Sequence, residues 1–150
     1  MSIEIQEVEP LHLACLRHVG PYPQIGETFG KLGPWVKQNQ LPWNQFVGIY
    51  YDDPGTVPGE QLRSDACIIV PPGTAASGEV TTQTIPGGKY AVYTHIGSYA
   101  KMGDSWMKAM EEIHAQGLKI GSRPMYELYV DDCADTPEER LRTAIHIPID

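Results

Sequence analysis

The stretch RHVGPYPQIGETFG, from Arg17 to Gly30, returns 77 positions later as THIGSYAKMGDSWM, from Thr94 to Met107. A shift of 79 positions then superposes YYDD, which begins at Tyr50, on YVDD, which begins at Tyr129. The chain therefore contains two copies of a unit of roughly 75 residues, too long for a solenoid repeat and too few for an array.

Each copy predicts the order strand, helix, strand, strand. The segment KYAVYTHI (89–96) is rich in β-branched and aromatic residues and ends before a glycine, as a strand does. Apolar residues then recur every three or four positions, which predicts a helix in each copy. The recurring residues are Ile25, Phe29, Leu32 and Val36 in the first copy, and Met102, Trp106, Met110 and Ile113 in the second. We expect Pro34 to kink or shorten the first helix. Two strands should follow in each copy, and they are FVGIYY (46–51), MYELYV (125–130), ACIIVP (from Ala66) and TAIHIP (from Thr143).

This order predicts an α+β fold built by tandem duplication. We expect one curved antiparallel sheet, with both helices on one face and a ligand cleft on the other, because grooves between repeated halves commonly bind small molecules. A length of 150 residues fits a single domain. The first copy should span about 1–71, a turn-rich linker about 72–79, and the second copy about 80–150.

Composition narrows the function classes. The chain is 41% hydrophobic and 20% charged, with no long apolar run, so we expect no membrane span. A net charge of −8 disfavours direct binding to nucleic acid. Three scattered cysteines, Cys15, Cys67 and Cys133, are typical of reduced thiols in a cytoplasmic protein.

A carboxylate distinguishes the two copies. Under the 79-residue shift, Glu127 takes the place of Gly48. Strand alternation puts Met125, Glu127 and Tyr129 on one face, and the opposite face is the more apolar, so we expect Glu127 on the open side of the sheet. A carboxylate among aromatic rings suits an organic cation, although a Glu on an exposed strand can also simply face water.

The candidate ligand-binding residues lie on or beside the strands predicted to line the groove, and each aromatic member could instead fill the core. They are Glu127, Tyr129, Met125, Tyr50, Phe46, Gly48, Tyr93 and Trp43.

Other polar residues favour structural roles. His18 and His95 end equivalent strands, and we expect hydrogen bonds at the strand-to-helix corner rather than a metal site, because too few ligands surround them. We expect Arg63 and Arg142 to form ion pairs with nearby carboxylates. No nucleotide, nucleophile or zinc-protease motif occurs, so no cofactor, metal or catalytic set is assigned.

The combination of YYDDPGTVPGEQLRSD, YELYVDDCADTPEERLRTAIHIPI, HVGPY and HIGSY resembles the GyrI-like small-molecule-binding domains, which include DNA gyrase inhibitory protein and effector-binding domains of AraC- and MerR-type regulators. The resemblance covers almost the whole chain and implies a tandem strand-helix-strand-strand fold with an acidic residue, here Glu127, in a ligand cleft. Both ends are occupied by the repeat, so we expect the sensor part without a helix-turn-helix segment.

The sequence supports three hypotheses about the function. The first is a binding module for aromatic, often cationic, small molecules around Glu127. The second is a protein-contact inhibitor of DNA gyrase. The third is a hydrolase of electrophilic ligands that uses Glu127 with Tyr93 or Tyr129 as acid or base, and this reading is less favoured because no nucleophile or oxyanion motif accompanies it.

Overall fold

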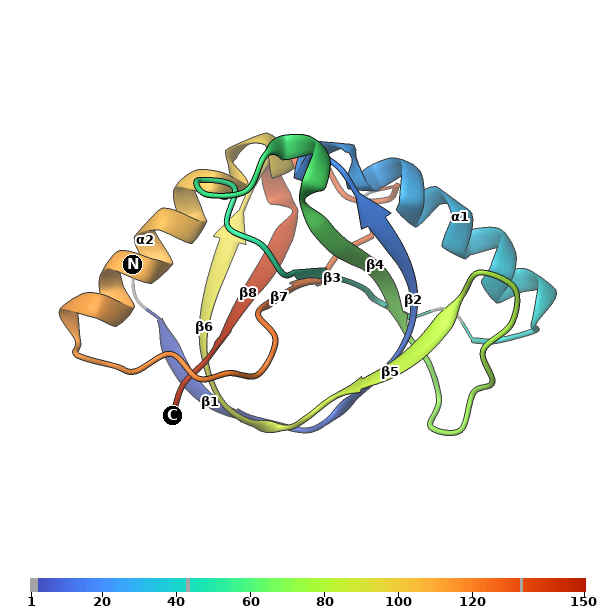
Figure 1. The fold of residues 1–150 in the computed structure, drawn as a ribbon, viewed down its shortest axis with the longest axis horizontal. Coiled ribbons are helices and arrows are strands. Elements are labelled where there is room, and N and C mark those ends of the chain that lie inside the picture. The colour runs from blue at the N-terminus through green and yellow to red at the C-terminus, as the bar shows by residue number, and fades with distance from the viewer. Residues whose placement is uncertain (1–2, 43, 133) are drawn as a thin grey trace. The chain divides into compact units, whose positions relative to one another are not determined.

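The computed structural model describes residues 3–42, 44–132 and 134–150 (Figure 1). Each copy contributes two strands, a helix and two further strands, with short 3-10 turns between them. In chain order the elements are β1 (Glu4–Val8), β2 (Leu11–Val19), α1 (Ile25–Gln38), β3 (Phe46–Tyr50), β4 (Arg63–Ile69), β5 (Thr81–Ile85), β6 (Gly88–Ile96), α2 (Met102–Ala115), β7 (Tyr126–Tyr129) and β8 (Arg142–Pro148). The predicted α+β duplication is confirmed, and the sequence reasoning missed β1 and β5.

The chain forms two compact units. The α1 unit comprises Leu11–Ile85, and its strands pair antiparallel in the order β5-β2-β4-β3. The α2 unit comprises Met1–Pro10 and Pro86–Asp150, and its strands pair antiparallel in the order β1-β6-β8-β7. Each unit is therefore a four-stranded antiparallel sheet with one helix. The single cleft predicted between the copies stays a prediction, as do the predicted boundaries of the copies.

The first strand of each copy belongs to the unit of the other copy. Strand β1 pairs with β6, and β5 pairs with β2. The reason lies in the two-residue connections, Glu9-Pro10 and Pro86-Gly87, because tight two-residue hairpins need a positive φ at their first position. Glu9 has no positive φ, and proline cannot adopt one. Neither strand therefore folds back on its neighbour in sequence.

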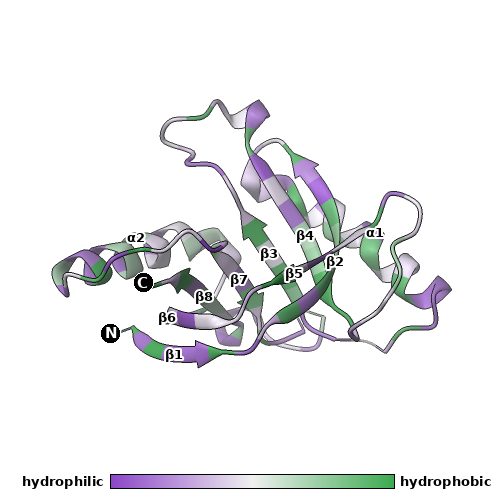
Figure 2. Ribbon diagram, turned by 60° about the horizontal axis from the view of Figure 1, so that its bottom comes forward, coloured by the Kyte–Doolittle hydropathy of each residue, from purple (hydrophilic) through white to green (hydrophobic). Residues whose placement is uncertain are grey.

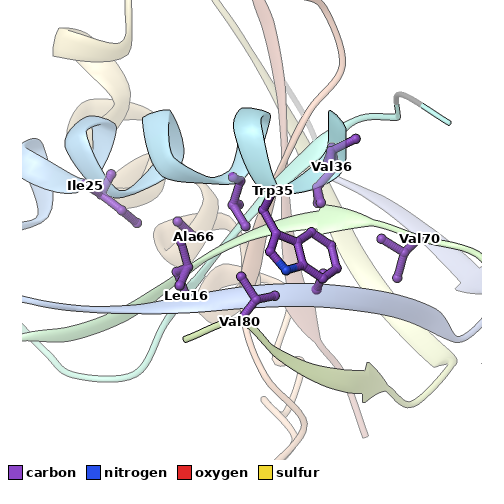
Figure 3. Packing of buried hydrophobic residues seen from close by; sticks show 10 residues of the cluster. Leu16, Ile25, Trp35, Val36, Ala66, Val70 and Val80 are labelled. Atoms are coloured by element: carbon purple, nitrogen blue, oxygen red, sulfur yellow. The ribbon is translucent and has the colours of Figure 1, made fainter. Parts of the chain in front are cut away.

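In the α1 unit, α1 packs on β2 and β4 through the predicted stripe together with Trp35, which the periodicity did not predict (Figure 3). Leu32 and Trp35 belong to one buried cluster with Leu16 and Ala66 of the sheet, and Val80 is part of the same cluster. Burying a large aliphatic or aromatic side chain contributes about 1.5 to 3 kcal/mol, so this stripe holds the helix to the sheet.

In the α2 unit, a matching cluster joins α2 to β6 and β8. Ala109 and Ile113 of the helix pack with Tyr93, Ile145 and Ile147. Figure 2 shows that hydrophobic and hydrophilic residues alternate around both helices, as one-sided burial requires.

Pro34 does not shorten α1. Both helices have 14 residues, and Pro34 lies inside α1, exposed to solvent. The prediction of a shortened helix was wrong because proline removes only one backbone donor, and the buried stripe on either side maintains the helix.

Candidate functional site

Strand β7 presents Glu127 to helix α2, not to the open side of the sheet. The indole Nε1 of Trp106, on α2, donates a hydrogen bond to Glu127, and Met125 packs against the cluster under the same helix. The opposite face of the strand is also covered, because Tyr126 is fully buried against His146. The predicted orientation was therefore wrong, since relative hydrophobicity cannot identify the helix-facing side when both sides are buried.

The Glu127 carboxylate is held by two neutral donors. Trp106 Nε1 donates to Oε2 at 2.5 Å, and the Tyr129 hydroxyl donates to Oε1 at 2.7 Å. Glu127 is only 5% exposed. A buried carboxylate is costly unless hydrogen bonds replace water, and these two donors fix the orientation of both oxygens.

Aromatic rings extend this site towards the surface. Tyr99 meets Tyr129 edge to face, with ring centroids 5.6 Å apart. Tyr99 is 41% exposed and borders a hollow of about 250 Å³. The contacts therefore run from solvent through Tyr99 and Tyr129 to Glu127.

The sequence reasoning named only part of this site. It missed Trp106 and Tyr99 as site residues, although Tyr99 is repeated at Tyr22 and Trp106 lies on the predicted helix stripe. Tyr93 is 3% exposed and lies in the core cluster under α2. Its predicted contact with a ligand stays a prediction.

The α1 unit repeats the aromatic pattern without the charge. Phe29 meets Phe46 with centroids 5.3 Å apart, and Tyr22 meets Tyr50 with centroids 4.8 Å apart, both edge to face. Gly48 lies between Phe46 and Tyr50 on β3, where the other copy has Glu127. That these three residues share one site with Glu127 stays a prediction.

Two further locations need to be distinguished from this site. Trp43, a predicted ligand-binding residue, lies outside the described residues. A larger hollow of about 400 Å³ lies beside Trp35 in the α1 unit, but none of the predicted site residues lines it. We therefore place the candidate site by its chemistry, at Glu127.

The two histidines connect strand ends to helices, as predicted. His18 Nδ1 lies 3.0 Å from the Thr28 hydroxyl, and Nε2 lies 3.2 Å from the carbonyl of Pro21. His95 makes the equivalent contacts with Ser105 at 2.6 Å and with the Ser98 carbonyl at 2.9 Å. Since a carbonyl only accepts, each Nε2 donates and each Nδ1 is directed at a hydroxyl.

The predicted ion pairs also form in both copies. Arg63 binds Asp52, and Arg142 binds Asp131, each at 2.8 Å between Nη2 and Oδ1. The guanidinium lowers the pKa of each aspartate, mainly through these side-chain hydrogen bonds. In each case the pair closes the loop between the third and fourth strands of the copy.

Within residues 3–42, 44–132 and 134–150, no cluster of three or more histidine, cysteine, aspartate or glutamate side chains could hold a metal ion. None of the helices in these same ranges is long and apolar enough to cross a membrane.

The chain matches a family model and curated relatives along most of its length. The model of the GyrI-like small molecule binding domain matches residues 1–150. DNA gyrase inhibitor 2 of Dickeya dadantii (strain 3937) is 33% identical over 136 residues, which cover 88% of this chain and 87% of that protein.

Solved structures share the fold. The EcmrR C-terminal domain has a TM-score of 0.86 at 16% identity, with 99% of this chain and 96% of that chain covered. The chain spans 57% of EcmrR as solved in its DNA complex. The structure of SAV2435 bound to tetraphenylphosphonium has a TM-score of 0.66 at 20% identity, with 100% of this chain and 94% of that chain covered.

Proposed function

This chain belongs to the GyrI-like small molecule binding domain family, and from that premise we propose that it binds aromatic organic cations at Glu127. The observation that carries the proposal is the buried carboxylate, whose oxygens accept hydrogen bonds from Trp106 and Tyr129. Neither of these two donors is charged, so neither forms an ion pair with the carboxylate. A cation brought against it gains charge pairing in a site from which water is largely excluded.

The surrounding rings support an aromatic cation over a simple one. The indole of Trp106 and the phenol of Tyr129 contact the carboxylate, and Tyr99 packs against Tyr129. Cation–π contact with such rings contributes about 0.5 to 2 kcal/mol each. A hydrated metal ion would gain little from them. SAV2435, which shares the fold, was solved with tetraphenylphosphonium, and this makes that cation a suitable first probe.

The test is calorimetric titration of the protein with tetraphenylphosphonium. We expect Glu127→Gln to weaken binding about tenfold or more, since a lost contact of 1.4 kcal/mol corresponds to a factor of ten. Glu111→Gln is the matched control, because it removes the same charge from an exposed position on α2. It should bind as the wild type does.

A neutral ligand of similar shape separates charge from packing. Triphenylphosphine oxide should bind wild type and Glu127→Gln about equally, because it carries no charge for Glu127 to recognise. If a folded Glu127→Gln variant binds tetraphenylphosphonium as tightly as wild type, the proposal is wrong. Recovery of a chemically altered ligand would instead favour the hydrolase reading.

A second candidate function is inhibition of DNA gyrase by direct protein contact. It is favoured by the name of the relative from Dickeya dadantii, DNA gyrase inhibitor 2, which aligns over 88% of this chain. We expect purified protein to slow supercoiling of relaxed plasmid by gyrase. No inhibition at a large molar excess would remove this candidate.

A further inference from the structure

Two cysteines that are distant in sequence face each other inside the α1 unit. Cys15 on β2 and Cys67 on β4 are direct cross-strand partners, and their exposures are 1% and 0%. Their neighbours Leu16 and Ala66 point into the cluster under α1. Because side chains alternate along a strand, both thiols lie on the face turned away from that helix.

Residue pairs between β2 and β4 alternate between hydrogen-bonded and non-hydrogen-bonded, and the type of pair determines the distance between the two cysteines. Gly20 N donates to the carbonyl of Leu62, and Val70 N donates to the carbonyl of His12. Hydrogen-bonded pairs therefore fall on the even-numbered residues of β2, and Cys15 with Cys67 forms a non-hydrogen-bonded pair. In such pairs the Cα atoms lie about 4.5 Å apart, which is within the roughly 4.4 to 6.8 Å that a disulfide spans.

The environments of the two sulfurs differ. Gln83 Nε2, on β5, lies 3.3 Å from Cys15 Sγ and 2.9 Å from Asp65 Oδ2. Burial raises the pKa of the Cys67 thiol. The contact with the Gln83 N–H and the neighbouring outer strand distinguish Cys15 from Cys67, so we assign Cys15 as the attacking thiol and Cys67 as the resolving thiol.

We propose that Cys15 and Cys67 form a modification site for hydrogen peroxide, at which a reversible disulfide joins β2 to β4. The Cys15 thiolate attacks one peroxide oxygen, the O–O bond breaks, and the departing hydroxide takes up the thiol proton to become water. Cys15 is then a sulfenic acid. Attack by the Cys67 sulfur forms the S–S bond, breaks the S–O bond and releases a second water, so that two thiols are oxidised by two electrons and one peroxide is reduced.

Strand β5, the outer strand of the α1 unit, provides a route by which peroxide can reach Cys15. Thr81, on β5, is the cross-strand neighbour of Cys15 on the opposite side from Cys67, and it is exposed. β5 has five residues and pairs with β2 inside this unit. Short outer strands open locally without global unfolding, and peroxide is small enough to enter through such an opening.

The test is treatment of the folded protein with hydrogen peroxide, followed by alkylation and peptide mass spectrometry. A Cys133→Ser background removes the third thiol, which lies outside the described residues. We expect the Cys15 and Cys67 peptides to be joined, with the loss of two hydrogens and full reversal by dithiothreitol. The link closes a loop of about 50 residues, so the unfolding temperature should rise by roughly 5 °C or more.

Single substitutions provide the controls. Cys15→Ser and Cys67→Ser should each abolish both the crosslink and the thermal shift. The proposal is overturned if both thiols of the folded Cys133→Ser protein are still reduced after peroxide treatment, as shown by alkylation in denaturant, while the denatured protein forms the disulfide readily. Joining of either cysteine only to a second protein molecule would overturn it as well.

Discussion

Glu127 and Gly48 occupy equivalent positions on β7 and β3, yet only Glu127 carries a charge. The aromatic neighbours are repeated, with Tyr129 against Tyr99 in one unit and Tyr50 against Tyr22 in the other. The charge at this position is therefore one of the differences between two surfaces that share a tyrosine pair, together with Trp106 in place of Phe29. The proposed recognition of cations by the α2 unit depends on this carboxylate.

Another residue that distinguishes the units is His146, on the face of β8 turned away from α2. It is 5% exposed, and its ring stacks on Tyr126 at 4.4 Å, with Tyr90 beside both rings. Its Nδ1 donates to the carbonyl of Ala144 at 2.9 Å. Burial lowers the pKa of His146 below its ordinary value of 6.5.

This lowered pKa predicts acid sensitivity. Below about pH 6.5 the unfolded chain binds a proton at His146 that the folded chain does not, so the free energy of unfolding should fall as pH falls towards 5, by at most about 1.4 kcal/mol per pH unit. His146→Phe should flatten this dependence. The check is urea unfolding between about pH 5 and 7, with exposed His114→Gln as the variant that keeps the slope.

At the scale of elements, the two helices have equal length but different composition. Helix α1 contains Gly26, Gly30, Gly33 and Pro34, whereas α2 contains one glycine. Glycine inside a helix costs about 0.5 to 1 kcal/mol relative to alanine. Helix α1 therefore depends more on packing of its buried stripe than on intrinsic propensity.

Replacing Gly30 by alanine should raise the free energy of unfolding by about 0.5 to 1 kcal/mol, since a Cβ there meets no atom within 4 Å apart from its chain neighbours and the helix's own backbone. Gly97→Ala is the contrasting variant. A Cβ there also has open space, but the backbone φ of +119° is unfavourable for alanine, so stability should fall by about 1 kcal/mol or more. Chemical denaturation of both variants provides the measurement, and equal effects would contradict the explanation.

At the scale of the whole molecule, each compact unit contains a strand from the other sequence copy. Strand β1 completes the sheet of the α2 unit, and β5 completes the sheet of the α1 unit. Neither copy therefore supplies all four strands of its own sheet. We infer that the two copies fold as mutually dependent parts.

Removal of β1 should consequently affect the distant half of the sequence. The amides of β6 lose their partner strand, so their hydrogen exchange should become faster by about tenfold or more, while β2, which pairs with β4 and β5, should keep its protection. Hydrogen–deuterium exchange with mass spectrometry resolves the two strands. Faster exchange in β2 with β6 unchanged would contradict the pairing.

The sequence by itself determined the repeated strand-helix-strand-strand order, the buried stripes of both helices, the two histidine corners, the ion pairing of Arg63 and Arg142 with carboxylates, and the charge at Glu127 that the other copy lacks. These features depend on residues a few positions apart or on comparison of the two copies, so periodicity and alignment suffice. Only the tertiary structure decided that Glu127 faces α2, that Cys15 meets Cys67, and that β1 and β5 exchange units. These three features depend on which distant segments pair and on which of two apolar faces a helix covers. Local sequence patterns specify neither the pairing nor the covered face.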